Sequence, residues 1–156
     1  MNKIGLILLA GAALAQAPPS AAPASPNQTP APASPFRNVG NMSRLMIDII
    51  YPTSDAIFYV DRDEPKTEVQ WNALASQALI LAESGNLLMM PGRARDQGNW
   101  IADSKLMIDA GAEAYRAARA KDLDGVRAVN DKLYESCVSC HTQYRPNYPR
   151  RPAASK

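Results

Sequence analysis

Residues 122–144 read DLDGVRAVNDKLYESCVSCHTQY and contain both cysteines and the only histidine of the 156-residue chain. Six positions in this stretch recur at steps of 4, 3, 4, 3 and 4, which places them on one face of an α-helix. These positions are Val126, Asn130, Leu133, Cys137, Cys140 and Tyr144. Asp122 is a suitable N-cap, and Pro146 and Pro149 stop the pattern. The stretch therefore predicts a long helix that starts after Asp122 and ends before Pro146.

A second stretch, residues 42–60, has the same spacing but contains a proline. Its predicted buried face consists of Met42, Met46, Ile49, Thr53, Ala56 and Val60. Pro52 has no N–H to donate within a helix, and its ring clashes with the preceding turn. We therefore expect a kink near Tyr51 or two abutting helices.

Two further helices are predicted between these stretches. One begins at Thr67, which makes a capping-box pair with Gln70, and ends at Pro91-Gly92. Its predicted buried face is Trp71, Leu74, Ala78, Leu81, Gly85 and Leu88. The other runs from near Asp96 to near Lys121, with a face of Trp100, Ser104, Met107, Gly111, Ala114 and Ala118. Because no segment alternates cleanly between apolar and polar residues, we expect an all-α fold, an antiparallel four-helix bundle.

The two ends of the chain have a different composition from the helical part. Residues 1–15 combine Lys3, an apolar run and an A-x-A site, which predicts a secretory signal peptide; the alternative is an N-terminal membrane anchor. Residues 16–35 contain seven prolines and no charge, which predicts a disordered linker. Residues 150–156 are predicted to be a basic, disordered tail. The folded domain is therefore expected over residues 36–149 and in the periplasm.

The composition excludes several classes of function. A formal net charge of +2 argues against a nucleic-acid partner, since such proteins usually carry a strongly basic patch. Two cysteines and one histidine cannot supply a four-ligand Cys/His zinc site. The sequence has no phosphate-binding glycine loop, and no apolar run reaches the roughly 18 residues that span a bilayer. We find no signature of a substrate pocket and do not expect an enzyme.

The segment from Cys137 to His141 reads C-x-x-C-H, the attachment motif for c-type haem. Residues i and i+3 share a helix face, so Cys137 and Cys140 can reach the same porphyrin, and His141 can bind its iron. The alternatives are a redox-active cysteine pair, a structural disulfide or a chance motif. A redox pair opens a helix after a strand, whereas this motif ends a long helix, and cysteines three apart in a regular helix are poorly placed for a disulfide.

An exported, alanine-rich helical domain with C-x-x-C-H in its last helix resembles the cytochrome c prime family, the class II c-type cytochromes. The resemblance covers about residues 39–148, and its specific part is C-x-x-C-H-x-x-Y-R from Cys137 to Arg145. It implies a four-helix bundle with one covalently bound haem c, His141 as the fifth iron ligand, Arg145 beside the haem, and frequent homodimers. The family's arginine in the first helix has no match, because Arg44 lies off that spacing.

The resemblance also implies that the first helix decides the sixth iron position. A methionine there gives a six-coordinate iron suited to electron transfer, whereas an apolar residue leaves a five-coordinate iron that binds gases such as NO. Met46 is the preferred ligand because it lies in mid-helix, whereas Met42 lies near the helix start. We therefore expect a periplasmic one-electron carrier that acts on redox partner proteins. The alternatives are a gas-binding haem protein and, if the motif is accidental, a haem-free bundle.

Overall fold

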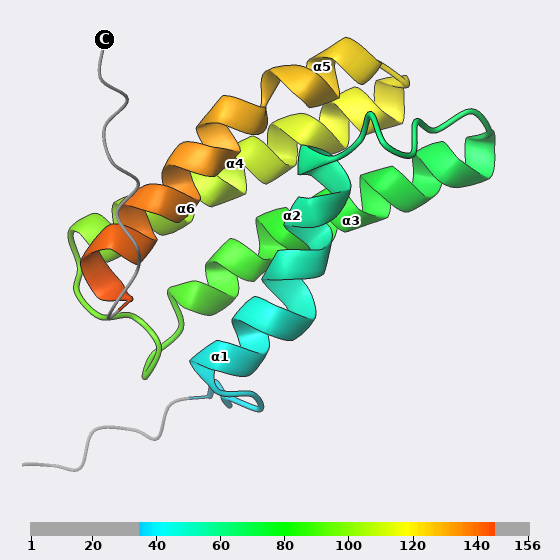
Figure 1. Ribbon diagram of the computed structural model, residues 1–156. Helices are drawn as coiled ribbons and strands as arrows, with labels where there is room; N and C mark the ends of the chain where they lie inside the picture. The colour runs from blue at the N-terminus through cyan, green and yellow to red at the C-terminus, as the bar shows by residue number, and fades with distance from the viewer. Residues whose placement is uncertain (1–34, 146–156) are drawn as a thin grey trace, which may run out of the picture. The chain divides into compact units, whose positions relative to one another are not determined.

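The computed structural model describes residues 35–145, and within this range the chain is helical without a strand (Figure 1). The elements are α1 (Met42–Leu45), η1 (Met46–Ile50), α2 (Tyr51–Phe58), α3 (Glu68–Leu88), α4 (Asn99–Ala120), α5 (Leu123–Ala128) and α6 (Asn130–Tyr144). They form four helical segments, because α1, η1 and α2 are continuous and only Val129 separates α5 from α6. The all-α prediction is confirmed.

Several sequence predictions lie outside the described residues. These are the signal peptide (1–15), the basic tail (150–156) and all of the linker (16–35) except its last residue. Pro146 and Pro149, which were predicted to end the last helix, also lie outside the described residues. Helix α6 does end at Tyr144, and Arg145 has the extended backbone expected before a proline. None of the helices within 35–145 has the length and hydropathy required of a membrane span.

Neighbouring segments pack in the order of the chain, with α3 and α4 in the most extensive contact (Figure 1). Small residues allow this close approach: a Cβ atom on Gly111 would lie 2.8 Å from the backbone nitrogen of Ala82. On either side of this pair, η1 and α2 pack on α3, while α5 and α6 pack on α4. The first and last segments also meet directly, because α2 contacts α5.

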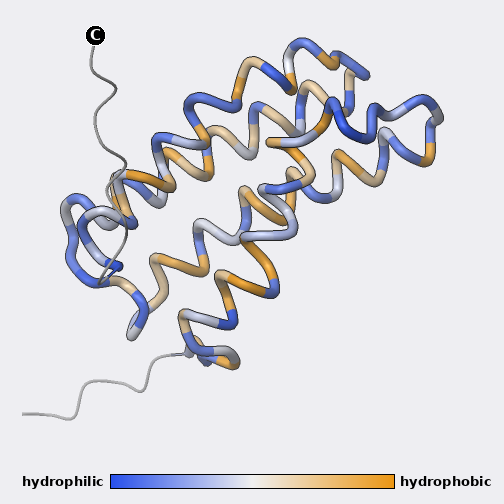
Figure 2. Tube along the Cα trace, in the orientation of Figure 1, coloured by the Kyte–Doolittle hydropathy of each residue, from blue (hydrophilic) through white to orange (hydrophobic). Residues whose placement is uncertain are grey.

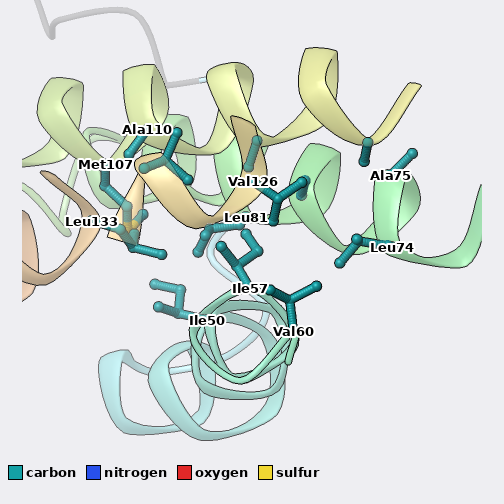
Figure 3. Close-up of a cluster of buried hydrophobic side chains, with 14 of the residues drawn as sticks. Ile50, Ile57, Val60, Leu74, Ala75, Leu81, Met107, Ala110, Val126 and Leu133 are labelled. Atoms are coloured by element: carbon teal, nitrogen blue, oxygen red, sulfur yellow. The ribbon is translucent and has the colours of Figure 1, made fainter. Parts of the chain in front are cut away.

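The predicted buried faces of the second, third and fourth segments agree well with the structure. Each helix carries both polar and apolar residues (Figure 2), and the apolar ones at helical spacing gather in a common core (Figure 3). The fully buried side chains include Ala78, Leu81, Ala110, Val126 and Leu133. The predicted caps are also present: Thr67 and Gln70 form a capping box, and Asp122 Oδ1 accepts a 2.9 Å hydrogen bond from the Gly125 N–H.

The predicted face of the first segment is partly wrong. Ile50 and Ile57 are buried, whereas the predicted Ile49 and Ala56 are only half-buried. The reason is the π-helical turn η1, in which the Tyr51 N–H donates to the carbonyl of Met46, five residues back. This turn adds one residue before Pro52 and so shifts the later positions around the helix. The expected disturbance near Tyr51 is thus present, but as a π-turn in a continuous helix.

Candidate functional site

The C-x-x-C-H segment occupies the last two turns of α6. Cys140 is buried, and Cys137 and His141 are half-buried. Both cysteines are free thiols, so the structural disulfide considered from the sequence is not formed in this structure. The three side chains lie at positions i, i+3 and i+4 of one helix and line a common cavity.

This cavity has a volume of about 570 Å³, within the range of about 300–1,000 Å³ common for cofactor and small-molecule sites. Its lining is mostly apolar or aromatic and consists of Met42, Ser43, Met46, Ile47, Ile50, Tyr51, Ser54, Arg95, Trp100, Cys137, Cys140, His141, Tyr144 and Arg145. The first helical segment and α6 supply most of these residues. Trp100 of α4 and Arg95 of the loop before it complete the lining.

Burial dominates the electrostatics of the motif. It raises the pKa of the Cys137 thiol, and it raises the pKa of Cys140 to about 11 with smaller contributions from the Asp103 charge and from Cys137. The same desolvation, followed by the nearby Arg145 charge, lowers the pKa of His141. At neutral pH the unmodified site therefore presents two thiols and a neutral imidazole, which can bind a metal ion through nitrogen.

One wall of the cavity is held by contacts between α6 and the start of α4. The Tyr144 hydroxyl donates to the Asp96 carboxylate, and the rings of Trp100 and Tyr144 meet edge to face with centroids 4.9 Å apart. The Trp100 indole N–H donates to the Leu88 carbonyl at 2.9 Å. The hydrogen bond from Tyr144 lowers the pKa of Asp96, while burial and then Asp96 raise the pKa of Tyr144 to about 12.

The predicted site residues all line this one cavity. Met46 and Met42 contribute from the first segment, and Arg145 contributes from the end of α6. Met46 also lines a second, smaller cavity with the three motif residues, whereas Met42 does not. Both methionines are half-buried.

Sequence reasoning missed several residues of the lining. Trp100 was predicted to lie in the core, and it is buried. It also lines the cavity, which the sequence did not indicate. Arg95 and Tyr51 carried no signal, because only the packing of distant segments brings them to the motif. Asp96 does not line the cavity, but it accepts the hydrogen bond from Tyr144. It does have a sequence signal as a helix-start residue, since its Oδ1 accepts from the Trp100 N–H at 3.1 Å.

Within residues 35–145, no group of three or more His, Cys, Asp and Glu side chains is arranged to hold a metal ion. Comparison with protein-family models, with curated proteins and with solved structures found no match for the chain.

Proposed function

We propose that the protein is a mono-haem c-type cytochrome that carries one electron. The observation that carries this proposal is the shared cavity of Cys137, Cys140 and His141, with Met46 on the first helical segment among its lining residues. In this proposal the two cysteines form thioether bonds to haem c and His141 is the proximal iron ligand. The four helical segments then make up an antiparallel bundle with haem attached to its last helix, as in the cytochrome c prime family.

The residues present fit such a group. The lining offers large apolar surfaces from Ile47, Ile50 and Trp100, which suit a flat apolar macrocycle. Its two guanidinium groups, on Arg95 and Arg145, suit the carboxylates that haem carries. Arg95 thereby supplies the cationic contact that the first helix does not offer at the family's position.

When bound, haem supplies an iron that gains or loses one electron. The protein's residues have the tasks of holding it and limiting access to it. His141 binds through one ring nitrogen, and its lowered pKa favours the neutral form that this requires. Trp100 and Ile50, both buried, exclude water from the inner part of the cavity. Tyr144 and Asp96 fix the end of α6 and so the position of the motif.

Met46 is the preferred sixth ligand. It lines both the main cavity and the smaller one beside the motif, and a thioether binds without losing a proton. One observation favours the alternative, a five-coordinate iron that binds NO: Ile50, one turn further along, also lines both cavities and is an apolar side chain. The proposed setting is the periplasm, where soluble or membrane-bound redox proteins exchange electrons with the cytochrome.

The test is production of the full chain in a host that attaches c-type haem. The purified protein should keep its haem during acid-acetone extraction and should show a low-spin spectrum with a sulfur-to-iron charge-transfer band when oxidised. Haem that extracts freely would refute covalent attachment. A high-spin protein that binds NO and CO readily would replace the electron-carrier proposal by the gas-binding one.

A further inference from the structure

A smaller cavity of about 40 Å³ adjoins the motif on the side of α4. Its lining consists of Met46, Ile50, Leu88, Asp103, Ser104, Met107, Ser136, Cys137, Cys140 and His141. Asp103 is the one acidic residue of this lining, and only 9% of it is exposed. Its Oδ2 atom is fully buried and has no hydrogen-bond partner among the described residues.

The other polar oxygens of this cavity cannot donate to Asp103. The Ser104 hydroxyl donates to the Trp100 carbonyl at 2.7 Å, and the Ser136 hydroxyl donates to the Leu133 carbonyl at 2.7 Å. A hydroxyl has one hydrogen, so each serine is left with acceptor capacity alone. Asp103 likewise only accepts when ionised. The oxygen atoms of this lining therefore only accept, and the thiols and the imidazole that also line the cavity form no hydrogen bond with Asp103 Oδ2. A small donor molecule would satisfy these acceptors.

A water molecule fits this requirement. The volume exceeds the roughly 10–15 Å³ that one water needs, and two to four polar partners are typical of buried water. A buried carboxylate without partners destabilises a fold, so packing alone does not explain Asp103. Its charge lies near Cys140, where it contributes to the electrostatics of the motif.

We propose that Asp103, Ser104 and Ser136 hold an ordered water at the inner end of the cavity, and that the buried Asp103 carboxylate lowers the reduction potential of the bound haem. This inference rests on the proposed function. An electron accepted from a partner protein would lower the charge of the haem-loaded site by one. A fixed negative charge nearby stabilises the more positive, oxidised state.

The experiment compares two variants of the haem-loaded protein, Asp103→Asn and Asp109→Asn. Asp109 is an exposed carboxylate on the same helix, so both variants remove one negative charge but only one removes it from the cavity. We expect Asp103→Asn to shift the one-electron equilibrium toward the reduced state by about tenfold, which equals about 59 mV. Asp109→Asn should give a much smaller shift. The melting temperature of Asp103→Asn should not fall, because no intramolecular hydrogen bond to the buried Oδ2 is lost.

Equal shifts in the two variants, or none in either, would overturn the electrostatic role. If Asp103→Asn folds poorly, Asp103→Leu provides the same comparison with an apolar side chain of similar size. A high-resolution crystal structure of the haem-loaded wild type tests the water directly, and its absence beside Oδ2 would overturn that part. Failure of the proposed function would give a different result from failure of this inference. Haem would then be extracted from the wild type by acid-acetone, before any potential is measured.

Discussion

The contact between α3 and α4 differs from the region around η1 and α6 in the size of the side chains. Where α3 meets α4, glycine and alanine bring the backbones together, and Gly111 has no room for a Cβ beside Ala82. Around η1 and α6 the side chains are long or bulky, and a cavity of about 570 Å³ lies among them. Protein interiors are normally packed to high density. The proposed haem would occupy this second region.

The largest expected effect comes from removing the attachment points in the η1–α6 region. The double variant Cys137→Ala/Cys140→Ala should lose all haem that resists acid-acetone extraction. The part of the protein around the cavity should also become loosely packed, because no side chain within residues 35–145 fills that space. Near-ultraviolet circular dichroism and thermal unfolding would measure this second effect.

Ser139→Ala is the matched control for the double variant, since Ser139 lies within the same motif and is exposed. It should keep its haem and its melting temperature. Covalent haem retained by the double variant would contradict the assignment of the two cysteines.

The next effect tests the tight α3–α4 contact. Gly111→Leu should lower the free energy of unfolding by about 3 kcal/mol, because even its Cβ would meet the backbone of α3. Ala102→Leu, at an exposed position of the same helix, should change it by less than about 0.5 kcal/mol. Urea unfolding followed by circular dichroism measures both. Equal losses would mean that the contact does not depend on a missing Cβ.

A smaller and purely local effect distinguishes the two methionines of the cavity. Met46→Ala should abolish the sulfur-to-iron band of the oxidised protein and open the iron to CO and NO, while the fold is retained. Met42→Ala should leave the spectrum unchanged, because Met42 lies outside the smaller cavity beside the motif. If only Met42→Ala removes the band, the sixth ligand is Met42 and the choice of Met46 is wrong.

The smallest effect concerns the hydrogen bond between Tyr144 and Asp96. Folding lowers the pKa of Asp96, so this carboxylate stabilises the fold at pH values above 3.8, its ordinary pKa. That stabilisation is lost as the pH falls through the lowered pKa of the folded protein. Folding raises the pKa of Tyr144 from 10.0 to about 12, so this hydroxyl stabilises the fold at pH values below 10.0. That stabilisation is lost as the pH rises through about 12.

Tyr144→Phe removes the tyrosine contribution and the largest cause of the lowered Asp96 pKa, while the backbone hydrogen bonds from Gly98 and Trp100 to Asp96 remain. The difference in melting temperature between wild type and variant should therefore be greatest between pH 3.8 and 10.0 and should shrink outside this window. Tyr134→Phe, an exposed position on α6, provides the control and should show no such pH profile. A difference that is constant across pH would show that the two groups are not coupled.

Local spacing along the chain was sufficient to predict four helical segments, the caps at Thr67 and Asp122 and most of the buried faces. It did not predict the turn at Val129 that divides the last segment into α5 and α6. The pattern works for α3, α4 and α6 because each is a regular helix, so positions three and four apart share a face. It also brought the three residues of C-x-x-C-H onto one face of one helix. The failure in the first segment has a local cause, since the π-turn before Pro52 changes the residue count per turn.

The cavity depends on contacts that no local pattern encodes. Arg95, Trp100 and Asp103 reach the motif only because α4 packs on α6, and Met46 reaches it because η1 packs on α3. The spacing of residues along the sequence indicates only which of them share a face of one helix. Which faces meet, and how much space remains between them, depends on the sizes of side chains on several helices at once. The first and last segments that face the cavity pack on the α3–α4 pair, whose own contact is closed by glycine and alanine.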